Sequence, residues 1–220
     1  MKNILIVIFI LTIAVSAQAQ STVGLSLGTS KSDRQTASFL YRQNLTSRWS
    51  LGAQISYGAI RYRFIDAIAI TEGQVGMIGL SLGYKIAEGD RYRLDANLAP
   101  RYRRIRSQNE FETINSHGIE IDPNILIGLK LSDQIFFHSG VMLRTAMQLR
   151  PEVIGNEQLP SAILTNALSL QKGDNLISLK TYIGPMNGAG GDTEKFYWQV
   201  SLGYQFSLGK STNSIPFFNF

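Results

Sequence analysis

Apolar and polar residues alternate one by one along most of the chain. The clearest case is the segment 196–208, in which every second residue is apolar: Phe196, Trp198, Val200, Leu202, Tyr204, Phe206 and Leu208. The residues between them are mostly small or polar. A period of two places successive side chains on opposite faces of a β-strand, so the segment predicts a strand with one apolar and one polar face.

The same alternation recurs in ten segments. They span about 21–30, 35–45, 49–62, 73–86, 91–106, 118–131, 134–149, 161–171, 175–184 and 195–208. A tilted strand needs roughly 9–11 residues to cross a membrane, and most of these segments are that long.

The connections between the segments alternate in length. Those after the second, fourth, sixth and eighth segments are short, whereas those at about 63–72, 107–117, 150–160 and 185–194 are mostly longer and polar. Short periplasmic turns, longer outer loops and an even strand number are typical of outer-membrane barrels. The sequence therefore predicts an all-β fold, a transmembrane antiparallel up-and-down β-barrel of ten strands over 20–208, with eight strands as the alternative. A β-sandwich would also alternate, but it needs neither strands of this length nor the short–long rule.

Residues 1–19 have the features of a secretory signal peptide. Lys2 precedes the apolar run 4–15, and Ala17-Gln18-Ala19 forms a cleavage site of small residues. The run is shorter than the roughly 20 residues that cross a bilayer, so we expect cleavage after Ala19 rather than an uncleaved anchor. The rest of the chain has no apolar run of 18 residues and therefore no transmembrane helix. Together with the export signal, the alternating strands predict a location in the bacterial outer membrane, in contact with its lipids.

Charged residues occupy the strand face opposite the apolar one, which is the lumen side of a barrel. We predict a lumen charge network of Arg93, Asp95, Arg101, Arg103, Glu120, Asp122 and Arg144. Pairing the fifth and sixth segments places residues whose numbers sum to about 223 opposite each other, so that Arg101 faces Asp122 and Arg103 faces Glu120. The network either fills and stiffens a narrow lumen, which we favour, or forms a selectivity ring for an anion or sugar.

Two prolines, Pro100 and Pro123, fall nearly opposite each other on the same two segments. Proline cannot donate to a strand ladder and normally lies at edges or bulges. We therefore expect a shared break or bulge there, or the upper rim of the barrel.

Aromatic residues cluster at the two ends of the apolar faces. The predicted girdle consists of Tyr41, Trp49, Tyr84, Tyr92, Phe137, Trp198 and Phe206. Two aromatic belts are expected where a bilayer meets water.

No set of residues predicts catalysis, a cofactor or a metal site. His117 falls in an expected outer loop, while His138 and Ser139 are adjacent on one strand and so point to opposite faces, which prevents a base–nucleophile pair. The glycine-rich segment 184–191 lacks the lysine of a phosphate-binding loop. The net charge of +5 is dispersed, with no aromatic–basic motif for nucleic acid.

The last predicted strand is followed by the tail 209–220, which ends in an aromatic cluster. Gly203, Tyr204, Phe206 and Leu208, a glycine followed by alternating large apolar residues, resemble the signal that the barrel-assembly machinery reads. As a pattern over the whole mature chain, the sequence resembles the small outer-membrane β-barrel proteins of Bacteroidota. The departure is that such proteins usually end with an aromatic on the last strand, whereas Phe220 lies twelve residues beyond Leu208.

The expected function is that of a non-enzymatic accessory or structural barrel with a mostly occluded lumen. Its outer loops, or a periplasmic tail carrying Phe217, Phe218 and Phe220, would bind other envelope proteins. Two other uses of the tail stay open, namely to plug the lower lumen or to lie at the membrane surface. The alternatives are a narrow porin-like channel for small solutes and, third, a lipid-modifying or proteolytic barrel.

Overall fold

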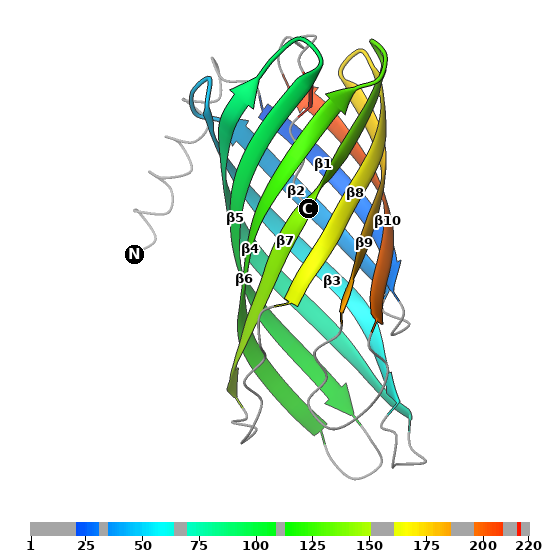
Figure 1. Cartoon of the computed structure of the whole chain (residues 1–220). Helices are drawn as coiled ribbons and strands as arrows, with labels where there is room; N and C mark the ends of the chain where they lie inside the picture. Colours follow the sequence, from blue (N-terminus) through cyan, green and yellow to red (C-terminus); the bar gives the residue numbers. More distant parts are fainter. Residues whose placement is uncertain are drawn as a thin grey trace.

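The computed structural model contains a closed barrel of ten antiparallel strands (Figure 1). It describes residues 21–30, 35–63, 70–108, 113–150, 161–185, 196–208 and 215–216. The strands are β1 (Ser21–Ser30), β2 (Gln35–Asn44), β3 (Trp49–Arg63), β4 (Ile70–Glu88), β5 (Tyr92–Gln108), β6 (Thr113–Lys130), β7 (Ile135–Arg150), β8 (Ser161–Lys172), β9 (Asn175–Pro185) and β10 (Phe196–Leu208).

Each strand pairs with its neighbours in sequence, and β10 closes the ring against β1, with Leu202 opposite Leu27. The predicted ten-stranded up-and-down barrel is confirmed, and the alternative of eight strands is wrong. Within the described ranges no helix is long and apolar enough to cross a membrane. The expected signal peptide, residues 1–19, lies outside them.

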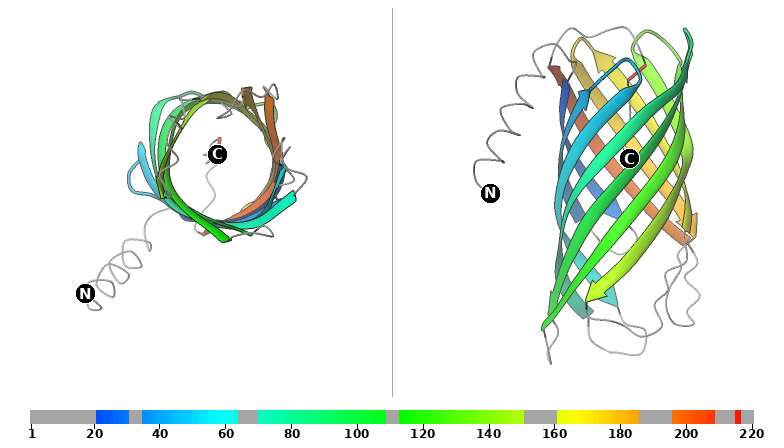
Figure 2. Two further views of the ribbon diagram at one scale, coloured as in Figure 1. Left: turned by 90° about the horizontal axis from the view of Figure 1, so that it is seen from below. Right: turned by 90° about the vertical axis from the view of Figure 1, so that its left-hand side faces the viewer.

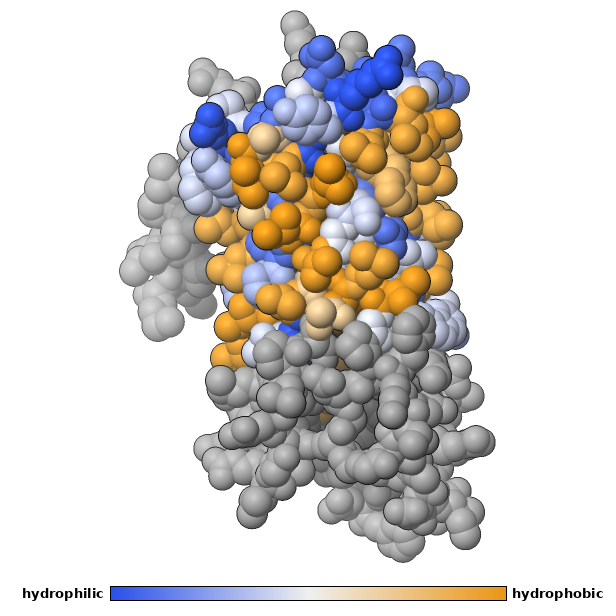
Figure 3. All heavy atoms as spheres, in the orientation of Figure 1, coloured by the Kyte–Doolittle hydropathy of each residue, from blue (hydrophilic) through white to orange (hydrophobic). Residues whose placement is uncertain are grey.

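The alternation of the sequence becomes an outer apolar face and a buried inner face. On β8, for example, Leu164 and Leu168 are about half exposed on the outside, while Thr165 and Ala167 between them are buried inside. Side chains of this outer kind form an apolar band around the middle of the barrel (Figure 3). The protein thus presents its apolar side chains outward, which is the reverse of a soluble domain.

The two ends of the barrel differ, and we name them the turn end and the loop end. The turn end carries the short connections 45–48, 89–91, 131–134 and 173–174 (upper end in Figure 1). At the loop end the longer strands, of which β4 has 19 residues and β6 has 18, continue well past the short ones. The expected connections 63–72 and 107–117 are therefore partly wrong, since β4 begins at Ile70 and β6 at Thr113. Pairing continues there after the apolar alternation has ended, so the pattern could not mark the true strand ends.

The register of β5 with β6 differs by two residues from the predicted one. Arg101 lies opposite Glu120 and Arg103 opposite Gly118, so paired numbers sum to 221 rather than 223. The difference arises because the connection is only 109–112, which moves its centre toward the N-terminus. A shift of two keeps every side chain on its predicted face.

The two prolines do not share a break. The β5–β6 ladder runs through both, with Pro100 opposite Ile121 and Pro123 opposite Leu98. Instead, Pro100 interrupts the ladder of β5 with β4, and Pro123 interrupts that of β6 with β7, without a change of register. Each proline turns its nitrogen, which cannot donate, toward its other neighbour, so the expected shared bulge is wrong.

Candidate functional site

The lumen of the barrel gathers the buried charges of the chain, and it is the candidate site. In its half nearer the loop end, Arg103 Nη1 lies 2.7 Å from Glu120 Oε1, and Arg101 pairs with Asp122 and lies 3.8 Å from Glu120. Arg144 on β7 reaches the same carboxylate, with Nε 3.6 Å from Asp122 Oδ1. The long arginine side chains span the two-residue difference in register. We call these five residues the loop-side cluster.

The other predicted network residues, Arg93 and Asp95, form a separate pair nearer the turn end. Arg93 Nε lies 2.8 Å from Asp95 Oδ2, and Asp95 is almost fully buried. Buried Arg42 on β2 donates to Ser50 on the same side of the lumen. The structure thus divides the predicted network between two levels.

A packed layer separates those levels. Asn97 Nδ2 donates to Asn124 Oδ1 at 2.8 Å, Met142 pairs with Asn124 across β6 and β7, and Leu126 is the next inward residue of β6; Leu126 and Met142 have almost no exposed surface. On β5, Asn97 lies between Arg93 and Arg101, which belong to the two different levels. We call the two asparagines together with Leu126 and Met142 the middle layer, and none of its residues is accessible enough to line an open channel.

Sequence reasoning missed the apolar part of the lumen. Leu126, Met142, Ile163, Ala167, Leu176 and Tyr182 form a buried cluster on the inner faces of β6 to β9. A signal was present, because 125–127 and 141–143 are runs of three apolar residues, which make both faces of a strand apolar.

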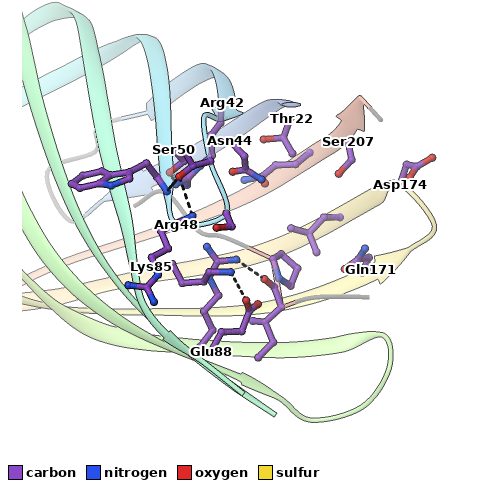
Figure 4. A pocket seen from close by; sticks show the side chains of 18 residues that line it. Thr22, Arg42, Asn44, Arg48, Ser50, Lys85, Glu88, Gln171, Asp174 and Ser207 are labelled. Carbon is purple, nitrogen blue, oxygen red and sulfur yellow. Dashed lines mark hydrogen bonds and ion pairs between the residues drawn. The ribbon is translucent and has the colours of Figure 1, made fainter. Parts of the chain in front are cut away.

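Among the described residues, one cavity lies on each side of the middle layer. The larger, of about 350 Å³, lies at the turn end; Figure 4 shows Arg42, Arg48, Lys85 and Glu88 among the side chains around it. The smaller, of about 70 Å³, adjoins the loop-side cluster. The two cavities share no lining residue.

Ile215 and Pro216, near the C-terminus, lie in the lumen and line the turn-end cavity. Ile215 is 3% exposed, and the short red segment 215–216 lies inside the ring of strands in Figure 2. Arg93 Nη1 donates to the Ile215 carbonyl at 3.1 Å, and His138 Nε2 donates to the Pro216 carbonyl at 2.9 Å. A Cβ on Gly128 would lie 3.0 Å from Ile215 and 2.9 Å from the His138 ring, so the close approach requires glycine. Phe217, Phe218 and Phe220, the predicted partner-binding residues, lie outside the described residues.

The histidines and serine weighed for catalysis are far from a catalytic arrangement. His138 faces the lumen, while Ser139 faces outward and donates to Asn166 Oδ1 at 2.9 Å. His117 lies in β6 rather than in a loop, and its Nδ1 is hydrogen-bonded to the Tyr102 hydroxyl. Among the described residues, no group of three or more His, Asp or Glu side chains is placed to hold a metal ion.

The predicted girdle residues all face outward. Trp49 and Tyr84 lie opposite each other next to the turn end, with ring centroids 4.6 Å apart. Tyr92 and Phe206 are also near that end, whereas Trp198 lies toward the loop end of β10. Tyr41 and Phe137 are half-buried among their neighbours.

The predicted assembly signal lies on the closing strand. Tyr204, Phe206 and Leu208 face outward and Gly203 faces inward on β10, where Leu208 pairs with Ser21 at the start of β1. Recognition by an assembly machinery remains a prediction.

Comparisons with known proteins relate the chain to others through its fold. No protein-family model matches it, and no curated protein matches it. Among solved structures, the NanC porin is similar with a TM-score of 0.51 at 9% identity, over 84% of this chain and 100% of that one. An outer-membrane channel from Pseudomonas putida has a TM-score of 0.49 at 9% identity, over 86% of this chain and 95% of that one. A major outer-membrane protein from Thermus thermophilus has a TM-score of 0.44 at 12% identity, over 87% of this chain and 100% of that one. At these identities the likeness to the NanC porin shows a common barrel fold.

Proposed function

We propose that the chain is exported by its leader, inserts into the bacterial outer membrane, and serves there as a non-enzymatic accessory or structural barrel with a closed lumen. The outward apolar band supports the location, because such a band is stable in lipid and costly in water (Figure 3). The Bacteroidota-type resemblance and the assembly signal on β10 belong to the same proposal.

The observation that carries the closed lumen is the middle layer. Its two asparagines bond to each other, and Leu126 and Met142 fill the space beside them without accessible surface. A ten-stranded barrel has an interior that side chains largely fill, whereas wide aqueous channels come with about 16 strands. The buried Ile215 also narrows the lumen toward the turn end.

Planar-bilayer recording of the purified chain tests this proposal. We expect no steady unitary current from the full chain, and none from a variant ending at Leu208, because the middle layer contains no tail residue. Steady unitary currents from the full chain would contradict the closed lumen. Currents from the truncated variant alone would assign the closure to the tail instead.

The second candidate is a narrow channel, and the charge of the cavities favours it. The larger cavity is lined by Arg42, Arg48, Lys85 and Arg93 against Glu88 and Asp174, and the smaller by three cations against Glu120. A channel through them would select anions. Its signature is a reversal potential shifted toward that of chloride in a potassium chloride gradient.

An accessory role also requires partners, which the outer loops or the tail would bind. Because the barrel itself holds Ile215 and Pro216, part of the tail is engaged within the chain. Affinity capture from native membranes, with the full chain and with 209–220 removed, tests this role. An empty partner list in both cases would contradict it.

A further inference from the structure

Three polar residues interrupt the apolar outer face over β7, β8 and β9. Ser139 pairs with Asn166, and Asn166 with Thr181, so the three lie in one row across adjacent strands. The outward residues around the row are large and apolar, including Val141, Leu164, Leu168, Ile177 and Leu179. Residues coloured white to blue also interrupt the apolar band on this side of the barrel in Figure 3.

Asn166 is the member of the row with the most hydrogen-bonding groups to satisfy. A carboxamide offers two N–H donors and an acceptor oxygen, and Ser139 Oγ occupies only the oxygen, at 2.9 Å. Turning the amide over would exchange its ends but would still leave one end without a partner among the described residues. In the hydrocarbon layer an amide group without a hydrogen bond is costly, so a polar group there usually faces a protein surface.

A second copy of the chain supplies what this amide lacks. Across a two-fold axis parallel to the membrane normal, two Asn166 side chains can each donate to the oxygen of the other. The outward positions of β7 to β9 inside the apolar band carry no charge, so two copies of the face meet without repulsion. The half-exposed Leu164, Leu168 and Leu179 around the amide would pack against the same residues of the second copy.

We propose that the chain forms a homodimer in the membrane through the outer face of β7 to β9, centred on reciprocal hydrogen bonds between the two Asn166 side chains. The inference rests on the proposed membrane location, but it is independent of whether the lumen conducts.

Energy transfer between donor- and acceptor-labelled copies in phospholipid vesicles measures the association. The chain has no cysteine, so Ser132→Cys in an exposed turn gives a single labelling site. On dilution with lipid, Asn166→Leu is expected to dissociate at a protein-to-lipid ratio about tenfold higher than the unchanged chain, since two hydrogen bonds in a bilayer are lost. The matched control is Ala53→Leu on β3, which lies five strands away around the ring and should leave association unchanged.

Cross-linking identifies the contacting face while keeping the amide. Leu168→Cys is expected to form a disulfide-linked dimer on oxidation in membranes, and Ala53→Cys is not. A monomeric unchanged chain at every dilution, equal association of Asn166→Leu, or equal cross-linking from both cysteines would overturn the homodimer. So would a different membrane protein that is captured by the unchanged chain and lost with Asn166→Leu.

Flotation with vesicles and heat-modifiable migration on gels are measured for every variant. A chain that neither floats nor shows the folded band would contradict the membrane location itself. A folded and inserted chain that stays monomeric would contradict only the dimer.

Discussion

Asp122 is the residue on which the loop-side cluster depends. It is 0% exposed and faces both Arg101 and Arg144. Removing one partner of a buried ion pair leaves uncompensated charge in a poorly hydrated interior. We expect Asp122→Asn to lower the free energy of unfolding by about 3 kcal/mol, measured by urea unfolding from phospholipid vesicles.

The chain offers a matched control for this substitution. Asp133 lies in the turn 131–134, with its side chain 94% exposed, and pairs with Lys130 at 2.8 Å. The hydrogen bond from Lys130 lowers the pKa of Asp133, but exposed pairs are screened by water and contribute little. Asp133→Asn should leave the unfolding midpoint unchanged, and equal losses from both variants would contradict the special role of Asp122.

Gly173 allows a second test at the scale of one residue. Its φ of +60° in the turn between β8 and β9 is a left-handed conformation, although a Cβ there would meet nothing within 4 Å. Gly173→Ala should therefore cost about 1 kcal/mol of folding free energy through backbone strain alone. Gly76 has the same open space without a positive φ, so Gly76→Ala should not destabilise the same urea transition. Equal effects would show that the turn conformation is not the cause.

The lumen charges could be predicted from the sequence because a strand assigns its faces by parity. Alternate positions of β5 and β6 share a face, and the positions opposite the apolar outer face hold the charged residues Arg101, Arg103, Glu120 and Asp122. A register error of two residues moves no side chain to the other face. The hydrogen bond from Arg93 to the Ile215 carbonyl could not be predicted in this way, since 122 residues of sequence separate the two.

Among the elements, the C-terminal segment is held by the barrel through its backbone. Arg93 and His138 donate to consecutive carbonyls, so these two hydrogen bonds do not depend on which side chains stand at 215 and 216. In a chain without other cysteines, Ile215→Cys should react with a water-soluble maleimide at least about tenfold more slowly than Thr46→Cys in an exposed turn.

Gly128→Val provides the companion variant for the tail. The added side chain would overlap the positions of Ile215 and His138, so it should expel the segment and raise the labelling rate of Ile215→Cys toward that of Thr46→Cys. Fast labelling without Gly128→Val would show that the segment does not stay in the lumen.

Strand order and number were predictable at the scale of elements, whereas strand ends were not. Alternation of apolar and polar residues identifies a strand only where one of its faces belongs to the apolar band, and β4 to β6 continue past this band at the loop end. The shared bulge predicted at the two prolines was wrong for a related reason. The sequence shows which residue lacks an N–H but not which neighbouring strand that nitrogen would face, and Pro100 and Pro123 face opposite neighbours.

For the whole molecule, the proposed location predicts that the cost of an outward charge depends on depth. Leu202 at the middle of β10 and Leu131 at the turn end are both outward and equally exposed, at 58% and 60%. An arginine at the bilayer midplane costs about 2–4 kcal/mol, falling to about 0–1 near the interface. We therefore expect Leu202→Arg, but not Leu131→Arg, to destabilise the barrel by that amount in reversible unfolding from vesicles. A barrel with its outer face in water would tolerate both variants alike, because neither side chain would leave its solvent. Equal stability of the two variants in lipid would thus contradict the membrane location, whatever the lumen conducts.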